Sequence, residues 1–400
     1  MARSRTQATD LVEETQNRLA ITTVLANRLF YSINWFAIPP IFYLIALDLH
    51  APVSGLGLIS SAFLVGIGLF QVPGAILSSR FGPRTMVITG MLVLSVSAML
   101  CALVSSIELI AVLRFFSGMG MALFFAPSIT LMTSHAKAGR AAFVLGLNNA
   151  VASLGGGIGL FAWALVGDSI GWRLSLVLIG GLGLASTVFL FLNVPRDAPS
   201  QGFQLRFPDL RRILLDRWLL LVGGVLLSYN IANTLVATFA EVYMHDSLGI
   251  SAGAAGGFGS LVILSGLFTA PLAGHFHDRV KNVKLVLVAS GLAMALGVAL
   301  ASLETAAAVV AAAVTVGLAS GVGYTFAFGT AWHSSELKHH RAIALSWVNS
   351  VQLLFSFWAP YLFSFVVLDY GYQVAWLTGG LYTAIFILPI LLFRGRATKA

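Results

Sequence analysis

The stretch GAILSSRFGPRTMV, residues 74–87, is a short basic turn between two long apolar runs. Arg80 and Arg84 lie on either side of a Gly-Pro pair, a combination that marks a turn. A second basic turn between apolar runs, GHFHDRVKNVK, occupies residues 274–284. Two such turns at corresponding places in a chain indicate a duplicated protein that crosses a membrane.

The composition supports a membrane protein. Of the 400 residues, 58% are hydrophobic and 10% are charged, whereas soluble domains carry about 25% charged residues. Helices cross a bilayer with about 20 apolar residues, and runs of this length favour helices over the short alternating segments of a β-barrel. The sequence therefore predicts an all-α membrane protein with twelve transmembrane helices. These spans are expected at residues 21–47, 55–78, 85–105, 109–133, 141–166, 173–193, 217–243, 254–276, 284–303, 305–332, 342–368 and 373–393.

Basic residues are distributed unevenly along the chain. Every Lys and Arg except Arg114 and Arg173 falls in a terminal segment, in a turn on one side of the membrane or near the span ends on that side. By the positive-inside rule, both termini are predicted to be cytoplasmic in a multi-pass protein of the inner or plasma membrane. The net charge of +8 thus reflects topology and not a nucleic-acid partner. The first 20 residues are not typical of a removable signal peptide, and the single cysteine, Cys101, excludes an intrachain disulfide.

The two halves of the chain repeat one another. RFFSGMGMAL at residues 114–123 and GLASGVGYTF at residues 317–326 share a Ser-Gly-x-Gly motif. Three further residues of the first half have an identical residue in the second half, at the same separation along the chain in each case. These pairs are Arg140 with Arg341, Asn148 with Asn349, and Asp168 with Asp369. We therefore expect two six-helix halves related by a pseudo-twofold axis. The predicted parts are a tail at 1–20, a bundle at 21–193, a linker at 194–216, a bundle at 217–393 and a tail at 394–400.

These features together resemble the major facilitator superfamily over essentially the whole chain. The turn signature of that family is similar to Leu77, Arg80, Gly82 and Arg84, with Ser79 in place of an aspartate. In the second half Asp278 and Arg279 match the signature. The resemblance implies that these turns act as gates, with Ser79, Arg80, Gly82 and Arg84 in one and Asp278 and Arg279 in the other. Because Ser79 lacks a carboxylate, we expect an asymmetric gate in which Asp278 and Arg279 form the stronger latch.

The fourth span also resembles the family, through Arg114 followed by Gly118 and Gly120. The fifth span carries the glycines of the drug-antiporter pattern, at residues 155–157 and 159, but lacks its proline. The resemblance therefore implies a transporter and disfavours a drug antiporter.

Polar side chains inside the spans mark a candidate substrate site, because polar groups in a bilayer are costly unless they face a cavity or a partner. They cluster on single faces of the spans at helical spacing. Either they line a central cavity, or they hold the bundle together through hydrogen bonds between helices. The candidate binding residues are Tyr31, Asn34, Trp35, Arg114, Asn148, Asn149, Asn230, Asn233, Tyr324, Asn349 and Gln352.

Charged groups are scarcer within the spans. Arg114 is predicted either to bind or gate an anion or to act as a brace to a carbonyl, Glu108 or Asp48. Arg28 is expected to reach the membrane interface. All acidic residues are placed in turns or at span ends, where Glu241 or Asp48 remains available for a coupling proton. The histidines show no ligand spacing that indicates a metal site.

The sequence thus predicts a monomeric secondary or facilitative transporter of a small anionic or neutral metabolite, working by alternating access. No catalytic motif, cofactor or metal is indicated, so the protein is not expected to be an enzyme. Uniport, exchange and symport remain open, as does the involvement of a coupling proton. The alternatives are proton-coupled efflux of drugs or amphiphiles and, from another class, a non-transporting membrane sensor or scaffold.

Overall fold

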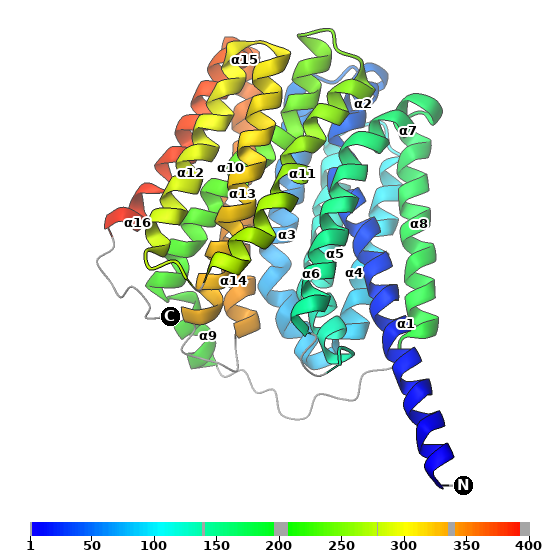
Figure 1. Cartoon of the computed structure of the whole chain (residues 1–400). Coiled ribbons are helices and arrows are strands. Elements are labelled where there is room, and N and C mark those ends of the chain that lie inside the picture. Colours follow the sequence, from blue (N-terminus) through cyan, green and yellow to red (C-terminus); the bar gives the residue numbers. More distant parts are fainter. Residues whose placement is uncertain (1, 138–140, 196–206, 278, 335–340, 393–400) are drawn as a thin grey trace.

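The computed structural model describes residues 2–137, 141–195, 207–277, 279–334 and 341–392, which form a bundle of long helices (Figure 1). The described residues contain no strand. The first half comprises α1 (Ala2–Phe36), η1 (Pro39–Ile41), α2 (Phe42–Leu49), α3 (Val53–Phe81), α4 (Pro83–Cys101), α5 (Ile107–Ser134), α6 (Ala141–Gly157), the π-helical turn η2 (Ile158–Ala162), α7 (Trp163–Ile170) and α8 (Trp172–Asn193). The second half comprises α9 (Phe207–Leu214), α10 (Arg217–Asp246), α11 (Ala252–His277), α12 (Val283–Leu300), η3 (Ala301–Leu303), α13 (Ala306–Ser334), α14 (Arg341–Phe355), α15 (Trp358–Ile385) and α16 (Leu388–Leu392).

The predicted all-α membrane architecture is confirmed. Ten helical stretches among the described residues are long and apolar enough to cross a membrane. An eleventh is bent by 47° between Glu14–Phe36 and Pro39–Leu49, where two prolines remove backbone donors and break the helix. The last of the ten, Ile343–Leu391, reverses at Gly371, whose φ of +81° is one that glycine adopts without strain. The stretch therefore holds two of the twelve predicted spans.

The basic turn at residues 74–87 is reduced to a single residue between two helices. Helix α3 ends at Phe81 and α4 begins at Pro83. Gly82 between them has φ +85° and ψ +147°, so a side chain there would be strained. Pro83 occupies the first turn of α4, where its missing N–H leaves no helical hydrogen bond unmade. The Gly-Pro pair thus makes a sharp reversal between consecutive spans.

The repeated Ser-Gly-x-Gly motif has the same packing role in both halves. A Cβ atom on Gly118 of α5 would collide with the backbone of α3, and one on Gly321 of α13 would collide with α11. Gly120 meets α4 in the first half, and Gly323 meets Ser290 of α12 as well as Tyr229 in the second. Small residues let membrane helices approach closely. The duplicated motif therefore makes equivalent close contacts between helices in the two halves.

The bundle has two distinct ends. Figure 1 shows α9 and the beginning of α1 at one end, which we call the α9 end, and α2 and α7 at the other, which we call the α2 end. Helix α1 is already helical from Ala2, so the polar stretch before residue 21 continues directly into the first span. Within the expected linker, helix α9 packs on α10 and α14.

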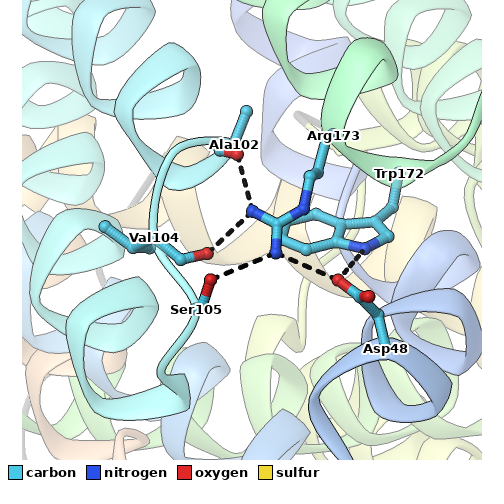
Figure 2. Close-up of polar contacts among 6 residues, drawn as sticks. All are labelled: Asp48, Ala102, Val104, Ser105, Trp172 and Arg173. Carbon is cyan, nitrogen blue, oxygen red and sulfur yellow. Dashed lines mark hydrogen bonds and ion pairs between the residues drawn. The ribbon is translucent and has the colours of Figure 1, made fainter.

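A polar cluster fastens the α2 end of the first half (Figure 2). The guanidinium of Arg173, at the beginning of α8, donates to the carbonyls of Ala102 (2.8 Å) and Val104 (3.0 Å) in the turn between α4 and α5. It also pairs with Asp48 of α2 at 3.0 Å, and the indole of Trp172 donates to the same carboxylate oxygen at 3.2 Å. Three separate segments are thereby held together by one arginine.

Arg173→Ala is expected to lower the melting temperature of the purified protein, because it removes the donors that join these three segments. Charged hydrogen bonds of this kind contribute about 1–2 kcal/mol in all at a half-exposed site. Asp48→Asn is expected to have a smaller effect, since an amide oxygen still accepts from both neighbours. Differential scanning fluorimetry in detergent measures both variants. An Arg173→Ala protein that melts with the wild type would show that the cluster adds no stability.

Candidate functional site

A cavity of about 240 Å³ lies between the two halves. Both halves contribute polar side chains to it, as a binding site at the interface of a duplicated bundle requires. The lining residues of the first half are Trp35, Phe36, Ile38, Pro39, Ile59, Ser60, Phe63, Leu64 and Arg114. Those of the second half are Asn230, Asn233, Thr234, Ala237, Thr238, Ile263, Tyr324, Asn349, Gln352 and Leu353.

Arg114 is the charged residue of this cavity. Its side chain on α5 is 4% exposed and lies 4.0 Å over the ring of Phe63. It donates to the backbone oxygen (3.3 Å) and the side-chain oxygen (3.2 Å) of Asn34, and to the backbone oxygen of Trp35 (3.3 Å). Its Nε has no acceptor among the described residues. Arg114 is therefore oriented by neutral dipoles of α1, and no carboxylate neutralises it in the described part of the chain.

The brace to an acidic residue that the sequence left open is not found. Asp48 pairs with Arg173, and Glu108 accepts from Ser106 at 2.6 Å. The alternative brace, to a carbonyl, is the arrangement that forms. These hydrogen bonds join α5 to α1. Because the acceptor oxygens are neutral, they leave the positive charge of Arg114 in place at the wall of the cavity.

A second cavity of about 340 Å³ adjoins the first and shares Trp35, Phe36, Ile263, Asn349 and Gln352 with it. It extends toward the α9 end, because it adds Arg28 and Tyr31, which precede Trp35 along α1. The expectation that Arg28 reaches the interface is wrong. This residue is 9% exposed, and its guanidinium lies 4.5 Å over the ring of Tyr31 and 5.4 Å over that of Phe125.

The distance of Arg28 from the helix end indicates the membrane interface, whereas its face of α1 indicates the cavity. Tyr31 and Trp35 follow Arg28 by three and seven residues and so share its side of α1. This spacing is the sequence signal that places Arg28 beside the predicted binding residues. Within the described residues, Nε and Nη1 of Arg28 have no acceptor. Gln71 of α3, which is 1% exposed, also lines this cavity and is a further residue absent from the predicted binding set.

The structure brings most of the predicted binding residues together. Two of them differ from the prediction, since Asn34 orients Arg114 without lining either cavity and Asn148, which is buried, lines neither. The first cavity gathers Trp35, Arg114, Asn230, Asn233, Tyr324, Asn349 and Gln352, and the second adds Tyr31 and Asn149.

The cavity-lining amides of the second half donate hydrogen bonds to protein oxygens. Asn230 donates to the hydroxyl of Ser356 at 2.6 Å, and Asn233 donates to the backbone oxygen of Tyr229 at 3.1 Å. Gln352 donates to the side-chain oxygen of Asn349. Asn230 thus joins α10 to the turn after α14, whereas the bonds of Asn233 and Gln352 lie within their own helices, and all of these amides line the cavity.

In the first half, the residues of the expected gate lie where α3 ends and α4 begins, at the α9 end of the bundle. Ser79 donates to the backbone oxygen of Ile76 at 2.6 Å, and Arg80 is exposed over Phe81. Arg84 donates to the carbonyls of Val194 (2.7 Å) and Phe191 (2.6 Å), which ties α4 to the end of α8 within one half.

In the second half, Asp278 lies outside the described residues. The guanidinium of Arg279 is 5.9 Å from the ring centre of Phe276. No group of three or more potential metal ligands occurs among the residues that the structure describes.

Comparison with known proteins agrees with this architecture. The chain is similar to the probable sulfoacetate transporter of Cupriavidus necator, with 24% identity over 64% of each chain, which is just under two thirds of that relative's length. It is also similar to the multidrug efflux protein YfmO of Bacillus subtilis, with 23% identity over 90% of this chain and 88% of the relative. A crystal structure of the nucleoside transporter NupG superposes with a TM-score of 0.78, covering 93% of this chain and 99% of NupG at 12% identity, which shows a shared fold.

The family model described as Major Facilitator Superfamily matches residues 24–360, which is most of the chain. This match extends through both halves and includes the basic turn, the Arg114 helix and the cavity between the halves. The prediction of a non-enzymatic transporter that crosses the membrane many times is thereby confirmed. The chain belongs to the Major Facilitator Superfamily.

Proposed function

We propose that the protein carries a small organic anion across the inner or plasma membrane by alternating access, with the α9 end in the cytoplasm. The observation that supports an anion is the pair of buried guanidinium groups, Arg114 and Arg28, in adjoining cavities. Neither forms an ion pair with a described acidic residue, and an isolated charge in a membrane interior is costly unless a ligand or partner compensates it. A carboxylate, sulfonate or phosphate would supply that compensation through bidentate hydrogen bonds.

The two arginines favour a substrate with two acidic groups. They lie on different helices, α1 and α5, and their cavities share lining residues, so one elongated ligand can approach both. Asn349 and Gln352 of α14 border both cavities and offer hydrogen bonds to the middle of such a ligand. A substrate of this kind would contact both halves, which is what coupling of binding to their movement requires. Sulfoacetate, named for one relative, has two acidic groups of this type.

The contacts between the halves support the alternating-access part of the proposal. Toward the α2 end, Gly57 of α3 packs against Pro360 and Ser364 of α15, and Gly256 of α11 packs against Leu160 of η2. The second cavity, which adjoins the central one, extends in the other direction, toward the α9 end. We infer that this arrangement exposes the site on the cytoplasmic side, and that the turns containing Ser79, Arg80, Gly82, Arg84, Asp278 and Arg279 close that side in the opposite state.

Efflux of drugs or amphiphiles is the second candidate. The multidrug relative matches nearly the whole chain, and Trp35, Phe36, Phe63 and Tyr324 give the first cavity aromatic walls. Lipophilic cations are nevertheless disfavoured, because Arg114 would repel them in a medium of low dielectric constant. The two candidates therefore differ in the charge of the ligand.

A thermal-shift screen distinguishes these candidates. Organic anions with one and two acidic groups, nucleosides, sugars and lipophilic cations are added to the purified protein in detergent. A ligand at 100 times its dissociation constant adds about 2.7 kcal/mol to the unfolding free energy, so a substrate gives a clear rise in melting temperature. We expect stabilisation by dianions such as sulfoacetate that exceeds the effect of an inert salt at equal ionic strength. Stabilisation by lipophilic cations alone would refute the anion proposal.

A further inference from the structure

A buried carboxylate that plays no part in the anion site lies near the α2 end of the bundle. Glu241 of α10 is 3% exposed, and neither of its carboxylate oxygens has a hydrogen-bond partner among the described residues. The sequence placed it at the edge of a span, with access to water. Its burial is therefore a finding that needs an explanation, since an unpaired carboxylate away from water is strongly disfavoured in its charged form.

Glu241 lies at the contact between the two halves. A Cβ atom on Gly256 of α11 would lie 3.3 Å from Oε1 of Glu241, 2.7 Å from the backbone oxygen of Leu160 and 3.2 Å from the Cβ atom of Ala164. Leu160 and Ala164 belong to the first half, whereas Glu241 and Gly256 belong to the second. The carboxylate thus lies against the surface that separates when the α2 end opens.

The charged groups around Glu241 do not neutralise it. Asp168, one turn beyond Ala164 on α7, is an exposed acid whose charge repels that of Glu241 across the contact. On α10 itself, His245 lies one turn away, pairs with Asp246 at 2.9 Å and packs against Tyr43 of α2, with the two ring centres 4.6 Å apart.

The other elements packed here add no charge. Neither η1 nor η2 has a titratable side chain. In α11, the titratable residues His275 and His277 stand at the opposite end of the helix from Gly256. Among the described residues, Glu241 consequently has a like charge opposite it and no ion-pair partner.

We propose that Glu241 is a proton-binding site that couples proton uptake on the α2 side to closure of the α2 end. When the halves are apart at that end, the carboxylate is exposed and ionises. A proton from water then binds to one carboxylate oxygen, which removes both the desolvation cost and the repulsion from Asp168. The halves can then close over the neutral carboxyl group and bury it to the extent that the structure shows for Glu241.

A route for release of the proton runs through the substrate site. Ala237 and Thr238 lie one helical turn before Glu241 on α10 and line the central cavity. The cavity in turn adjoins the one that extends toward the α9 end. This proposal rests on the alternating-access transport proposed above and gives it a driving force, since a proton bound on one side and released on the other makes the transporter a symporter.

The test follows the opening of the α2 end as a function of pH and needs no substrate. Spin labels are attached at Leu47→Cys of α2 and Tyr370→Cys of α15, two exposed positions on different halves, after Cys101 is replaced by alanine. Pulsed electron paramagnetic resonance in nanodiscs then gives the distance distribution from acidic to alkaline pH. For the wild type we expect the short-distance population to grow as the pH falls, because protonation of Glu241 permits closure.

Three variants make the test specific. Glu241→Gln is expected to keep the short distance at every pH. Asp168→Asn is expected to move the transition to lower pH, because loss of the neighbouring charge lets Glu241 stay ionised further into the acidic range. Asp246→Asn, an exposed acid on the same helix, serves as the matched control and is expected to keep the wild-type transition.

Two outcomes would overturn the proposal: a wild type whose distances do not respond to pH, or a Glu241→Gln variant with the wild-type pH response. A Glu241→Gln protein that is misfolded is recognised by its loss of a cooperative melting transition, and Glu241→Leu then provides the neutral replacement. Failure of the anion proposal appears instead in the ligand screen, so the two failures are distinguishable.

Discussion

Arg114→Ala is expected to reduce uptake of the substrate anion by at least roughly 100-fold while the protein remains folded. Removing one partner of a buried, charged hydrogen-bonded pair costs on the order of 3 kcal/mol, which corresponds to that factor. The protein should stay folded because Arg114 bonds to backbone and amide oxygens of α1 that carry no charge, so no unpaired ion remains after the substitution. Uptake is measured in proteoliposomes with the anion that gives the largest thermal shift.

Two further variants separate charge from shape. Arg114→Lys keeps the positive charge but loses the planar fork, so we expect intermediate uptake, with a weaker apparent affinity for the anion. Arg18→Ala removes an exposed arginine that pairs with Glu14 on the surface, and uptake should match the wild type. Undiminished uptake by a folded Arg114→Ala protein would show that the arginine acts only as a brace between α5 and α1.

The parts of the fold that follow from local sequence were predictable. Apolar runs predicted the spans because a helix is the way in which a single segment satisfies its own backbone in a bilayer. The Gly-Pro pair at residues 82–83 predicted a turn because glycine adopts the positive φ that position 82 requires without strain. The Ser-Gly-x-Gly repeat indicated duplication because the same close helix contact is made twice.

The pairing of charges could not be read from the sequence. Asp48 was considered as a partner for Arg114, but the structure gives it to Arg173, which is 125 residues away along the chain. Which acid meets which arginine depends on the relative rotation and depth of packed helices, and a hydropathy pattern fixes neither. The same limit explains Glu241, whose position near a span end suggested water while packing of α11 and η2 buries it.

Gly57→Val is expected to abolish transport by holding the α2 end open. A Cβ atom on Gly57 would lie 2.7 Å from the carbonyl oxygen of Pro360 and would also overlap the side chain of Ser364, both on α15 of the other half. The backbone of a helix cannot yield as a flexible side chain does, so the closed contact is lost. Overpacking of about 3 kcal/mol changes a two-state equilibrium by roughly 100-fold.

The valine at position 57 clashes with α15 only in the state in which the α2 end is closed. Once the halves separate at the α2 end, the space next to Gly57 is free, so valine is tolerated there and the protein folds. The spin-label distance between residues 47 and 370 should therefore lengthen, and acidic pH should no longer shorten it, because a protonated Glu241 permits closure but cannot remove the steric block.

Gly181→Val is the matched control. Gly181 is also a helical glycine, on α8, but a Cβ atom there would meet nothing within 4 Å. Both substitutions replace glycine with a β-branched residue in a helix, so they share any change in helix propensity, and only Gly57→Val adds the wedge. If both variants transport equally well, the contact between α3 and α15 does not close the α2 end, and the halves must seal that side elsewhere, with the contact at Gly256 as the remaining candidate.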